Sequence, residues 1–275
     1  MTIIAISRCT LAGATLVAEE VASELQVPCI SREIIVDAAK EGGISEDMLT
    51  EQIDTPPSSV FTSYSKEREV YLWHIRSALC QHALKGSFVY HGYSAHILLA
   101  DISSVLRVGV VAPMEYRIKA VMTSQIVDAK AAEKHIHHID RWRAKWVRHL
   151  YGVDWRDPAL YDLVVNLEKL DVEEASHLVA QMAANLPHFT YTEETQQEIA
   201  NAALVSRVSA ALAKGGELFT GRLTLTAENN VLTISGRARS RDACNAILSA
   251  ANQVIGDAEL RYEVVAAMDD ISWGV

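Results

Sequence analysis

The chain has 275 residues, enough for one large or two ordinary domains, and 49% of them are apolar, as in a globular protein. Its net charge of −10 argues against a general nucleic-acid-binding protein, and its four scattered cysteines argue against a disulfide framework or a thiolate zinc site. No stretch approaches the ~18 consecutive apolar residues of a membrane-spanning helix. The first apolar run is also too short for a signal peptide. We therefore expect a cytoplasmic protein without a transmembrane segment.

The chain opens with a strand-loop-helix pattern. A β-branched apolar run at residues 3–7 is followed by a loop, and then by a helix whose apolar face extends to Leu25. Proteins that bind mononucleotides hold phosphate at such a position, through backbone N–H groups at the helix N-terminus. Phosphate loops are usually rich in glycine and carry a lysine. Here Gly13 is the only glycine of the loop, no lysine is present, and Leu11 and Ala12 stand where bare backbone is wanted.

Apolar runs that predict strands then alternate with segments that predict helices. The strands are expected at residues 27–30, 87–91, 105–112 and 161–166, and the helices at 32–41, 65–85, 113–122, 128–150 and 172–184. Strands and helices that alternate in this way predict an α/β fold, with a parallel sheet covered by helices on both faces.

The helix expected at 128–150 carries a basic stripe. Its members follow one another at steps of four, three, four and three residues and are Lys134, His138, Arg141, Lys145 and Arg148. One interpretation is a solvated helix face. The other is a lid that closes over phosphates, because arginine offers forked donors to phosphate oxygens. The sequence leaves both interpretations open.

Two other groups of residues in this region have simpler interpretations. His135 and His138 can share a helix face, but neither they nor His137 have a cysteine or acidic partner at ligand spacing, so we expect exposed histidines and no metal site. The tryptophans at positions 142, 146 and 155 are better explained by core packing than by stacking on a base.

The pattern changes after residue 186. Residues 187–195 suggest a linker, and the following segments predict a helix at 195–214, strands at 222–226 and 231–235 joined at Asn229-Asn230, a helix at 240–255 and a strand at 260–266. An α-β-β-α-β order does not extend the first sheet naturally. We therefore expect a domain at 1–186, a linker at 187–195 and a small second domain at 196–275.

Residues 1–186 resemble the cytidylate kinase-like family of nucleoside monophosphate kinases. The motifs that carry this resemblance are Ile6-Ser7-Arg8, Ser31-Arg32-Glu33, Leu106-Arg107-Val108, Ala112-Pro113-Met114-Glu115-Tyr116-Arg117, Ile139-Asp140-Arg141, Asp154-Trp155, Asp157-Pro158 and Tyr161-Asp162-Leu163-Val164-Val165-Asn166. The resemblance implies a P-loop kinase fold and phosphoryl transfer from ATP to CMP or dCMP with Mg²⁺. That chemistry is mostly positioning and charge neutralisation.

The sequence departs from this family at two phosphate-binding positions. The family's Gly-Ser-Gly-Gly loop falls on residues 11–14, where only Gly13 is retained, and its Gly-Arg step falls on Gly92-Tyr93. The lid cations Arg141 and Arg143 are present. Since the loss of one donor from a preorganised site can cost ~10²–10³ in rate, two losses predict little turnover.

Residues 196–275 resemble a BON module, a unit found in bacterial proteins. The resemblance rests on Val208-Ser209-Ala210-Ala211-Leu212, Val231-Leu232-Thr233-Ile234-Ser235-Gly236, Ser240-Arg241-Asp242-Ala243 and the strand from Leu260 to Val265. It implies a non-catalytic unit that contacts a protein partner or a small ligand.

These observations lead to a set of expected site residues and to three functional hypotheses. The expected nucleotide- and phosphate-binding residues are Ser7, Arg8, Gly13, Thr15, Arg117, Arg141, Arg143 and Lys145. Thr15 has a simpler interpretation as a helix cap. The favoured hypothesis is a degenerate kinase that binds ATP or another adenine or cytosine nucleotide and acts as a sensor or regulatory protein, with a possible homo-oligomer. The alternatives are an active CMP or dCMP kinase that uses Mg²⁺, and a structural interaction protein without a nucleotide.

Overall fold

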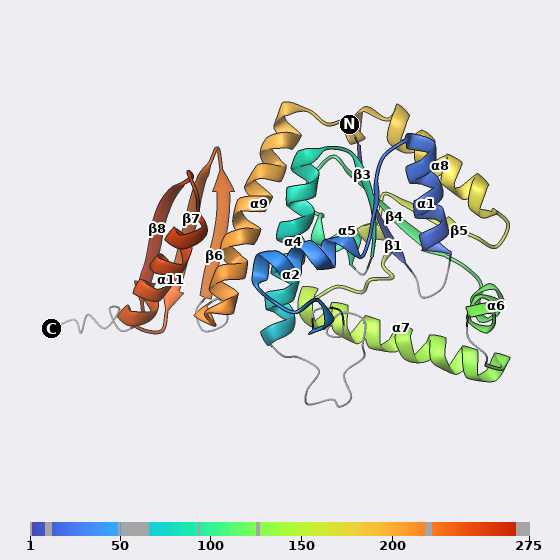
Figure 1. Ribbon diagram of the computed structural model, residues 1–275, viewed down its shortest axis with the longest axis horizontal. Helices are drawn as coiled ribbons and strands as arrows, with labels where there is room; N and C mark the ends of the chain where they lie inside the picture. Colours follow the sequence, from blue (N-terminus) through green and yellow to red (C-terminus); the bar gives the residue numbers. More distant parts are fainter. Residues whose placement is uncertain are drawn as a thin grey trace. The chain divides into compact units, whose positions relative to one another are not determined.

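The computed structural model describes residues 2–8, 13–48, 50, 66–92, 94–124, 127–217 and 222–267. The chain divides into two compact units, the first made of Met1–Glu33 with Lys85–Thr192 and the second of Ile34–Leu84 with Glu193–Val275 (Figure 1). Leu11, Ala12 and Tyr93, which carry much of the argument for a degenerate phosphate site, lie outside the described residues. None of the helices in the described ranges is long and apolar enough to cross a membrane.

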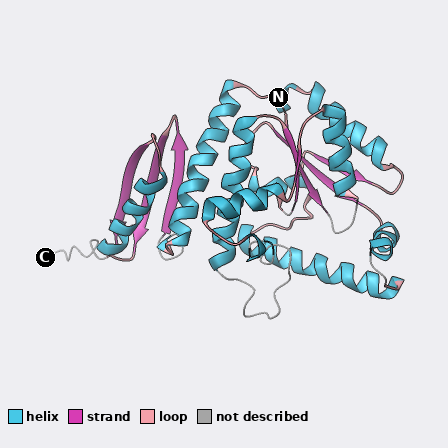
Figure 2. Cartoon of the chain, viewed as in Figure 1, coloured by secondary structure: helices cyan, strands magenta, loops and turns pink. Residues whose placement is uncertain are grey.

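The first unit contains a five-stranded parallel sheet, as predicted (Figure 2). Its strands are β1 (Ile3–Arg8), β2 (Cys29–Ile30), β3 (Phe88–Gly92), β4 (Val105–Val111) and β5 (Leu163–Asn166), in the order β2-β3-β1-β4-β5. The strands are short, β-branched and almost continuously apolar, which is typical of parallel strands buried on both faces. All the carboxyl ends therefore lie at one edge of the sheet.

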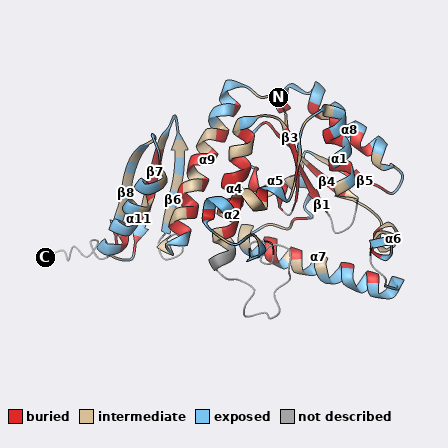
Figure 3. Cartoon of the chain, in the orientation of Figure 1, coloured by how far each residue is buried: buried red, intermediate tan, exposed pale blue. Residues whose placement is uncertain are grey.

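Helices cover both faces of this sheet. The helices of the first unit are α1 (Ala14–Leu25), α5 (Ala95–Leu98), α6 (Met114–Ser124), α7 (Ala129–Tyr151) and α8 (Val172–Asn185), with 3-10 turns at Pro158–Leu160 and Pro187–Phe189. On one face, Val17 and Val21 of α1 and Val179 of α8 pack in a core with Ile4 and Ile6 of β1. The short helix α5 packs against β1, β3 and β4. Figure 3 shows buried residues along the strands and on α1 and α8.

The helix α7 is amphipathic. It begins after Asp128, whose carboxylate accepts a hydrogen bond from the Ala131 N–H, and it ends at Gly152, which has the left-handed φ of 71°. Ile136 and Trp146 are buried, whereas every residue of the predicted basic stripe is exposed. Buried and exposed residues therefore alternate along α7 with the helical period of 3.6 residues that the sequence predicted.

The second unit combines helices with a small mixed sheet. Its elements are α2 (Glu33–Gly42), α4 (Lys66–Lys85), α9 (Glu193–Lys214), β6 (Arg222–Glu228), β7 (Val231–Ala238), α11 (Arg241–Val254) and β8 (Glu259–Ala266). The sheet has the order β6-β7-β8, in which β6 is antiparallel and β8 parallel to β7. The helix α9 begins at Glu193, inside the stretch expected to be a linker.

The small sheet has its own apolar core. Leu232 and Ile234 of β7 pack with Leu204 and Val208 of α9 and with Ile247 of α11. The hairpin between β6 and β7 turns at two asparagines with φ of 50° and 63°, which is the predicted turn chemistry. A separate C-terminal sheet is thus confirmed. The BON resemblance and the domain boundaries at 186 and 196 stay predictions.

Candidate functional site

The carboxyl edge of the parallel sheet brings several predicted residues together. Ser7, near the end of β1, is in register with Gly92 of β3 and Gly109 of β4. Open α/β sheets bind ligands in the crevice outside this edge. The side chain of Ser7 is buried at this position.

Gly13 begins α1 at the same edge. Its φ of 82° and ψ of 4° are left-handed, which suits glycine. A Cβ atom at this position would lie 2.8 Å from Leu167 Cδ1 and 3.0 Å from the Tyr116 hydroxyl oxygen. The side chains of Tyr116 and Leu167 therefore lie close beside the start of the helix.

The start of α1 corrects one expectation. Gly13 is the N-cap residue and makes no side-chain capping hydrogen bond, and Thr15 is the second residue inside the helix. The interpretation of Thr15 as the cap is therefore wrong, because the chain turns into the helix two residues earlier. Its role in phosphate binding stays a prediction.

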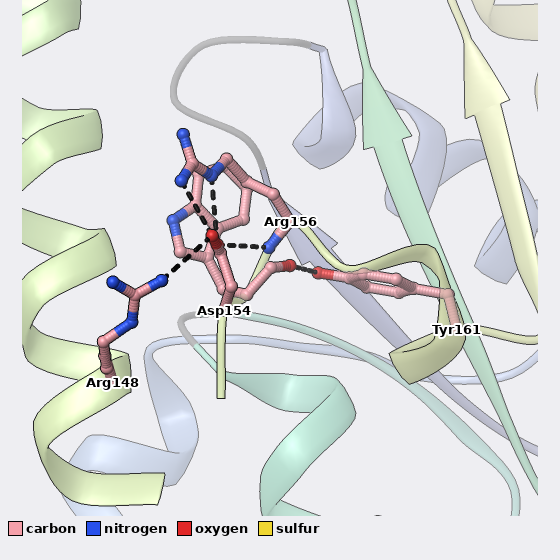
Figure 4. Close-up of polar contacts among 5 residues, drawn as sticks. Arg148, Asp154, Arg156 and Tyr161 are labelled. Atoms are coloured by element: carbon pink, nitrogen blue, oxygen red, sulfur yellow. Dashed lines mark hydrogen bonds and ion pairs between the residues drawn. The ribbon is translucent and has the colours of Figure 1, made fainter. Parts of the chain in front are cut away.

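Tyr161 contacts several elements on the α5 side of the sheet. A Cβ atom on Gly109 would lie 3.2 Å from Tyr161 Cδ1, so the glycine allows the ring to lie against β4. The Tyr161 hydroxyl donates a hydrogen bond to the Trp155 carbonyl oxygen at 2.6 Å (Figure 4). It also lies 3.5 Å from Ser7 Oγ. Its ring stacks on His96, with the ring centroids 4.5 Å apart. A buried polar cluster thus joins β1, α5 and the segment after α7.

His96 is a buried, neutral histidine within this cluster. The residue is only 2% exposed, and neither nitrogen of its ring has a hydrogen-bond partner among the described residues. Burial, together with the positive charges of Arg107 and Arg143, lowers the pKa of His96 to about 3.

Ser94, which precedes α5, has a left-handed φ of 57°. Such backbone strain in a non-glycine residue is concentrated at functional sites.

The two lid arginines predicted from the sequence point to different environments. Arg143 is only 4% exposed, and its guanidinium carbon lies 5.4 Å from the centroid of the Trp155 ring, within cation–π range. Arg141 is exposed, and its Nε donates to the His137 carbonyl oxygen at 3.1 Å. Lys145 is also exposed. The structure therefore places Arg143 in the cluster and leaves Arg141 and Lys145 on the outer face of α7.

Arg117 of α6 is bound to a carboxylate. Its Nη2 donates to both oxygens of Asp140 in α7, at 2.9 and 2.7 Å. The pair is largely buried and links the two helices. Arg117, expected to contact phosphate, is thus engaged by a charge within the chain.

A second carboxylate engages the C-terminal end of the basic stripe. Asp154 lies between Arg148 and Arg156, with Arg148 Nη2 at 3.5 Å and Arg156 Nη2 at 2.8 Å from its Oδ2 (Figure 4). The hydrogen bonds from Arg156 lower the pKa of Asp154 to about 2. Asp162 is likewise bound by Arg107, at 2.7 Å. These carboxylates are occupied by arginines, so Asp140, Asp154 and Asp162 do not fit the role of direct Mg²⁺ ligands.

The structure gives the burial of the histidines and tryptophans singled out in the sequence. His135, His137 and His138 are exposed, as predicted. Trp146 and Trp155 are buried, which confirms core packing for these two. The sequence reasoning missed His96 and Tyr161 as parts of the cluster. Tyr161 stood in a family motif, whereas nothing near His96 in the sequence marks it.

Residues 3–169 match the model of the cytidylate kinase-like family. The chain belongs to this family. It is 24% identical over 166 residues to the cytidylate kinase of Methanothermobacter thermautotrophicus, which covers 58% of this chain and 92% of that protein. It is 29% identical over 101 residues to the cytidylate kinase of Staphylothermus marinus, covering 37% of this chain and 56% of that protein.

The fold is also found among solved structures. An uncharacterized protein from Eubacterium ventriosum superimposes with a TM-score of 0.53 and 21% identity, over 68% of this chain and 100% of that chain. At this identity the likeness shows the fold alone. The chain spans just over half the length of the Staphylothermus marinus relative.

Proposed function

We propose that this protein binds a nucleotide at the carboxyl edge of its parallel sheet, transfers phosphate slowly or not at all, and acts as a sensor or regulatory protein. The observation that carries the proposal is the start of α1. It keeps the left-handed glycine of a phosphate-binding turn, but the side chains of Tyr116 and Leu167 lie within 3.0 Å of the position of a Cβ on Gly13. A nucleotide can still reach the backbone N–H groups of the helix start, with less room around its phosphates.

The ion pairs of α6 and α7 support the same proposal. Arg117, expected from the sequence to bind phosphate, is paired with Asp140, and Arg148 of the basic stripe is paired with Asp154. Phosphoryl transfer relies on cations that are already positioned where charge develops in the transition state. Each of these pairs would have to open before its arginine could reach a phosphate oxygen. Binding is compatible with this arrangement, but fast chemistry is not.

The ligand that fits best is an adenine or cytosine nucleotide. Its phosphates would contact Ser7, Arg8, Gly13 and Thr15 at the start of α1 and the buried Arg143, while Arg141 and Lys145 would close over them from α7. ATP or CMP is favoured because the relatives named above are cytidylate kinases. Mg²⁺ would enter as part of a metal–nucleotide complex, since the three aspartates near the site are bound to arginines.

The second unit would report occupancy of the site. We propose that its C-terminal part is a BON-like module that contacts a protein partner or a small ligand, in a cytoplasmic protein. Its separate apolar core supports an independent role for the small sheet.

An active CMP or dCMP kinase is the second candidate. The family match favours it, because residues 3–169 include the start of α1 and all of α7. Under this hypothesis, nucleotide binding would itself displace Asp140 and Asp154 from their arginines.

Two measurements on the full chain separate these candidates. In a coupled assay with ATP, Mg²⁺ and CMP or dCMP, we expect turnover far below the ~1–100 s⁻¹ of working kinases. Turnover within that range would contradict the proposal and support the second candidate. In a thermal-shift and calorimetric titration with AMP, ADP, ATP and CMP, we expect at least one nucleotide to bind. Binding of none would leave a structural interaction protein.

Substitutions on α7 test whether the basic stripe is a lid. The double variant Arg141→Ala/Lys145→Ala should weaken binding of the nucleotide identified above about tenfold or more, because charge-assisted contacts to phosphate are lost. Lys40→Ala, which removes an exposed cation from α2, is the matched control and should leave the affinity unchanged. If the wild type, the double variant and Lys40→Ala bind the nucleotide with equal affinity, the basic stripe is a solvated helix face and not a lid.

A further inference from the structure

The outer edge of β8 is a long strand edge without a partner among the described residues. β8 is the last strand in the order β6-β7-β8 and hydrogen-bonds on one side to β7. At the other end of the sheet, β6 lies beside α9 (Figure 1). Natural proteins usually protect an exposed edge with charged side chains, lysine above all, with proline, with a bulge or by keeping the strand very short. β8 has eight residues and contains neither proline nor lysine.

We propose that this edge is the interface of a symmetric dimer, in which the β8 strands of two copies pair antiparallel around Tyr262. The proposal goes beyond nucleotide binding and does not depend on it. A two-fold axis through Tyr262 would join the two three-stranded sheets into one continuous sheet. Such an interface is isologous: if residue i of one copy contacts residue j of the other, then residue j of the first copy contacts residue i of the second.

The backbone of β8 has the correct alternation for this pairing. The Glu259 N–H donates to the Asn230 carbonyl oxygen at 3.0 Å, and the Ala267 N–H donates to the Ala238 carbonyl oxygen at 2.8 Å. Both odd-numbered residues thus direct their backbone groups toward the β7 side. Because successive residues of a strand alternate, Leu260, Tyr262 and Val264 direct their N–H and C=O groups outward, away from β7.

The charges on β8 match each other when the axis lies at Tyr262. Glu259, Arg261 and Glu263 alternate along its exposed face. With the axis at Tyr262, Arg261 of each copy lies opposite Glu263 of the other, which gives two identical ion pairs. These are non-hydrogen-bonded pairs, in which opposite side chains lie closest, with Cα atoms ~4.5 Å apart.

The neighbouring registers are disfavoured by the same charges. An axis at Arg261 would place Arg261 against Arg261 and Glu259 against Glu263. An axis at Glu263 would place Glu263 against Glu263. Like charges directly opposite one another destabilise a strand pair. An axis at Leu260 would also pair Glu259 with Arg261, but only residues 259–261 of β8 would then lie opposite the β8 of the other copy, whereas residues 259–265 do so with the axis at Tyr262. The charges therefore disfavour the axes at Arg261 and Glu263, and the length of paired strand favours Tyr262 over Leu260.

The other face of β8 supplies apolar contacts in the same register. Leu260, Tyr262 and Val264 are half-buried and pack at the margin of the core beneath α11. The Tyr262 hydroxyl donates to the Cys244 carbonyl oxygen at 2.7 Å, which holds its ring in place. In the dimer Leu260 would meet Val264, and the two Tyr262 rings would lie side by side, so each apolar face would continue across the axis.

Analytical ultracentrifugation of the full chain over a range of concentrations tests the proposal. The wild type should show a concentration-dependent dimer. Arg261→Glu or Glu263→Arg should each raise the dimer dissociation constant about tenfold or more, since each change turns two attractive pairs into two repulsive ones. The double variant Arg261→Glu/Glu263→Arg should recover the dimer, because the pairs are restored with their charges exchanged. Arg222→Glu, a charge reversal at an exposed position of β6, is the matched control and should not change dimerisation.

A mixing experiment separates this register from a general effect of charge or folding. An equimolar mixture of Arg261→Glu and Glu263→Arg should form a heterodimer more readily than either variant dimerises alone, since each interface pair then joins opposite charges. A wild type that stays monomeric at the highest concentration, or a dimer that neither single variant weakens, would overturn the proposal. Failure of the double variant and of the mixture to recover association would also overturn it.

Discussion

At the scale of single residues, the candidate site depends on groups that their neighbours constrain strongly. Gly13 has a left-handed backbone conformation that residues with a Cβ rarely adopt. Burial keeps His96 neutral. The buried Arg143 lies over the ring of Trp155. Each constraint links α1, α5 or α7 to the same edge of the sheet. A change at one of these residues should therefore be felt both in stability and at the site.

Gly13→Ala should destabilise the first unit by about 2–4 kcal/mol. The left-handed conformation alone costs an L-residue about 1–2 kcal/mol, and the added Cβ would press on Leu167 and Tyr116. Gly152→Ala is the matched control, because Gly152 has a similar φ of 71° but nothing within 4 Å of the added atom. Urea denaturation of both variants should show the larger loss at Gly13. Equal losses would mean that the neighbours of Gly13 move aside freely.

His96 should make stability fall as the pH falls below 6.5. The unfolded histidine takes up a proton near pH 6.5 and the folded one only at about 3, so the unfolded state binds more protons between these values. The slope contributed by one such group is at most about 1.4 kcal/mol per pH unit. Melting temperatures between pH 7.5 and 5 should therefore drop less in His96→Phe, which keeps a ring against Tyr161, than in the wild type. His188→Phe, at an exposed position, should follow the wild-type profile.

At the scale of elements, an ion pair attaches α7 to α6, because Arg117 of α6 binds Asp140 near the middle of α7 through one guanidinium nitrogen. A second pair, between Arg148 of the last turn and Asp154 just after the helix, joins α7 only to the segment that follows it. The first pair is largely buried, whereas the second is more exposed. Helix α7 is thus held in one position by charges that a phosphate could also attract.

Arg117→Lys should destabilise the first unit by about 1–2 kcal/mol, because a lysine ammonium is more strongly hydrated than a guanidinium and costs more to bury beside Asp140. Arg156→Lys, the same change in the more exposed pair with Asp154, should cost only a few tenths of a kcal/mol. Chemical denaturation of the two variants provides the comparison. A loss at Arg117 as small as that at Arg156 would show that the pair contributes little to holding α7.

At the scale of the whole molecule, the division into units does not follow the order of the sequence. Residues 34–84 group with the C-terminal part and not with the parallel sheet that flanks them in the chain. Within that second unit, Lys214 at the end of α9 donates to the Gly42 carbonyl oxygen of α2, at 3.1 Å. Ile199, Ser206 and Ala213 of α9 are buried but lie outside the core of the small sheet.

A fragment of residues 193–267 should accordingly be less stable than the same residues in the full chain. Without residues 34–84, the buried residues of α9 that do not belong to the small-sheet core would be exposed to water, which costs hydrophobic stabilisation. Thermal melts followed by circular dichroism should show a lower midpoint for the fragment. A fragment as stable as the full chain would instead favour an independent domain close to the predicted boundary at 196.

The sequence by itself determined the elements and the class of fold. Apolar periodicity, the Asn229-Asn230 turn and the family motifs predicted the parallel sheet, the long amphipathic α7 and the separate small sheet, because these features depend on neighbours close in the chain. Only the tertiary structure decided what faces the site. His96 stacks on Tyr161 across 65 positions of the chain, Arg117 binds Asp140 from another helix, and Gly13 rather than Thr15 caps α1. Long-range contacts of this kind depend on how the elements pack against one another, so local residue patterns do not predict them.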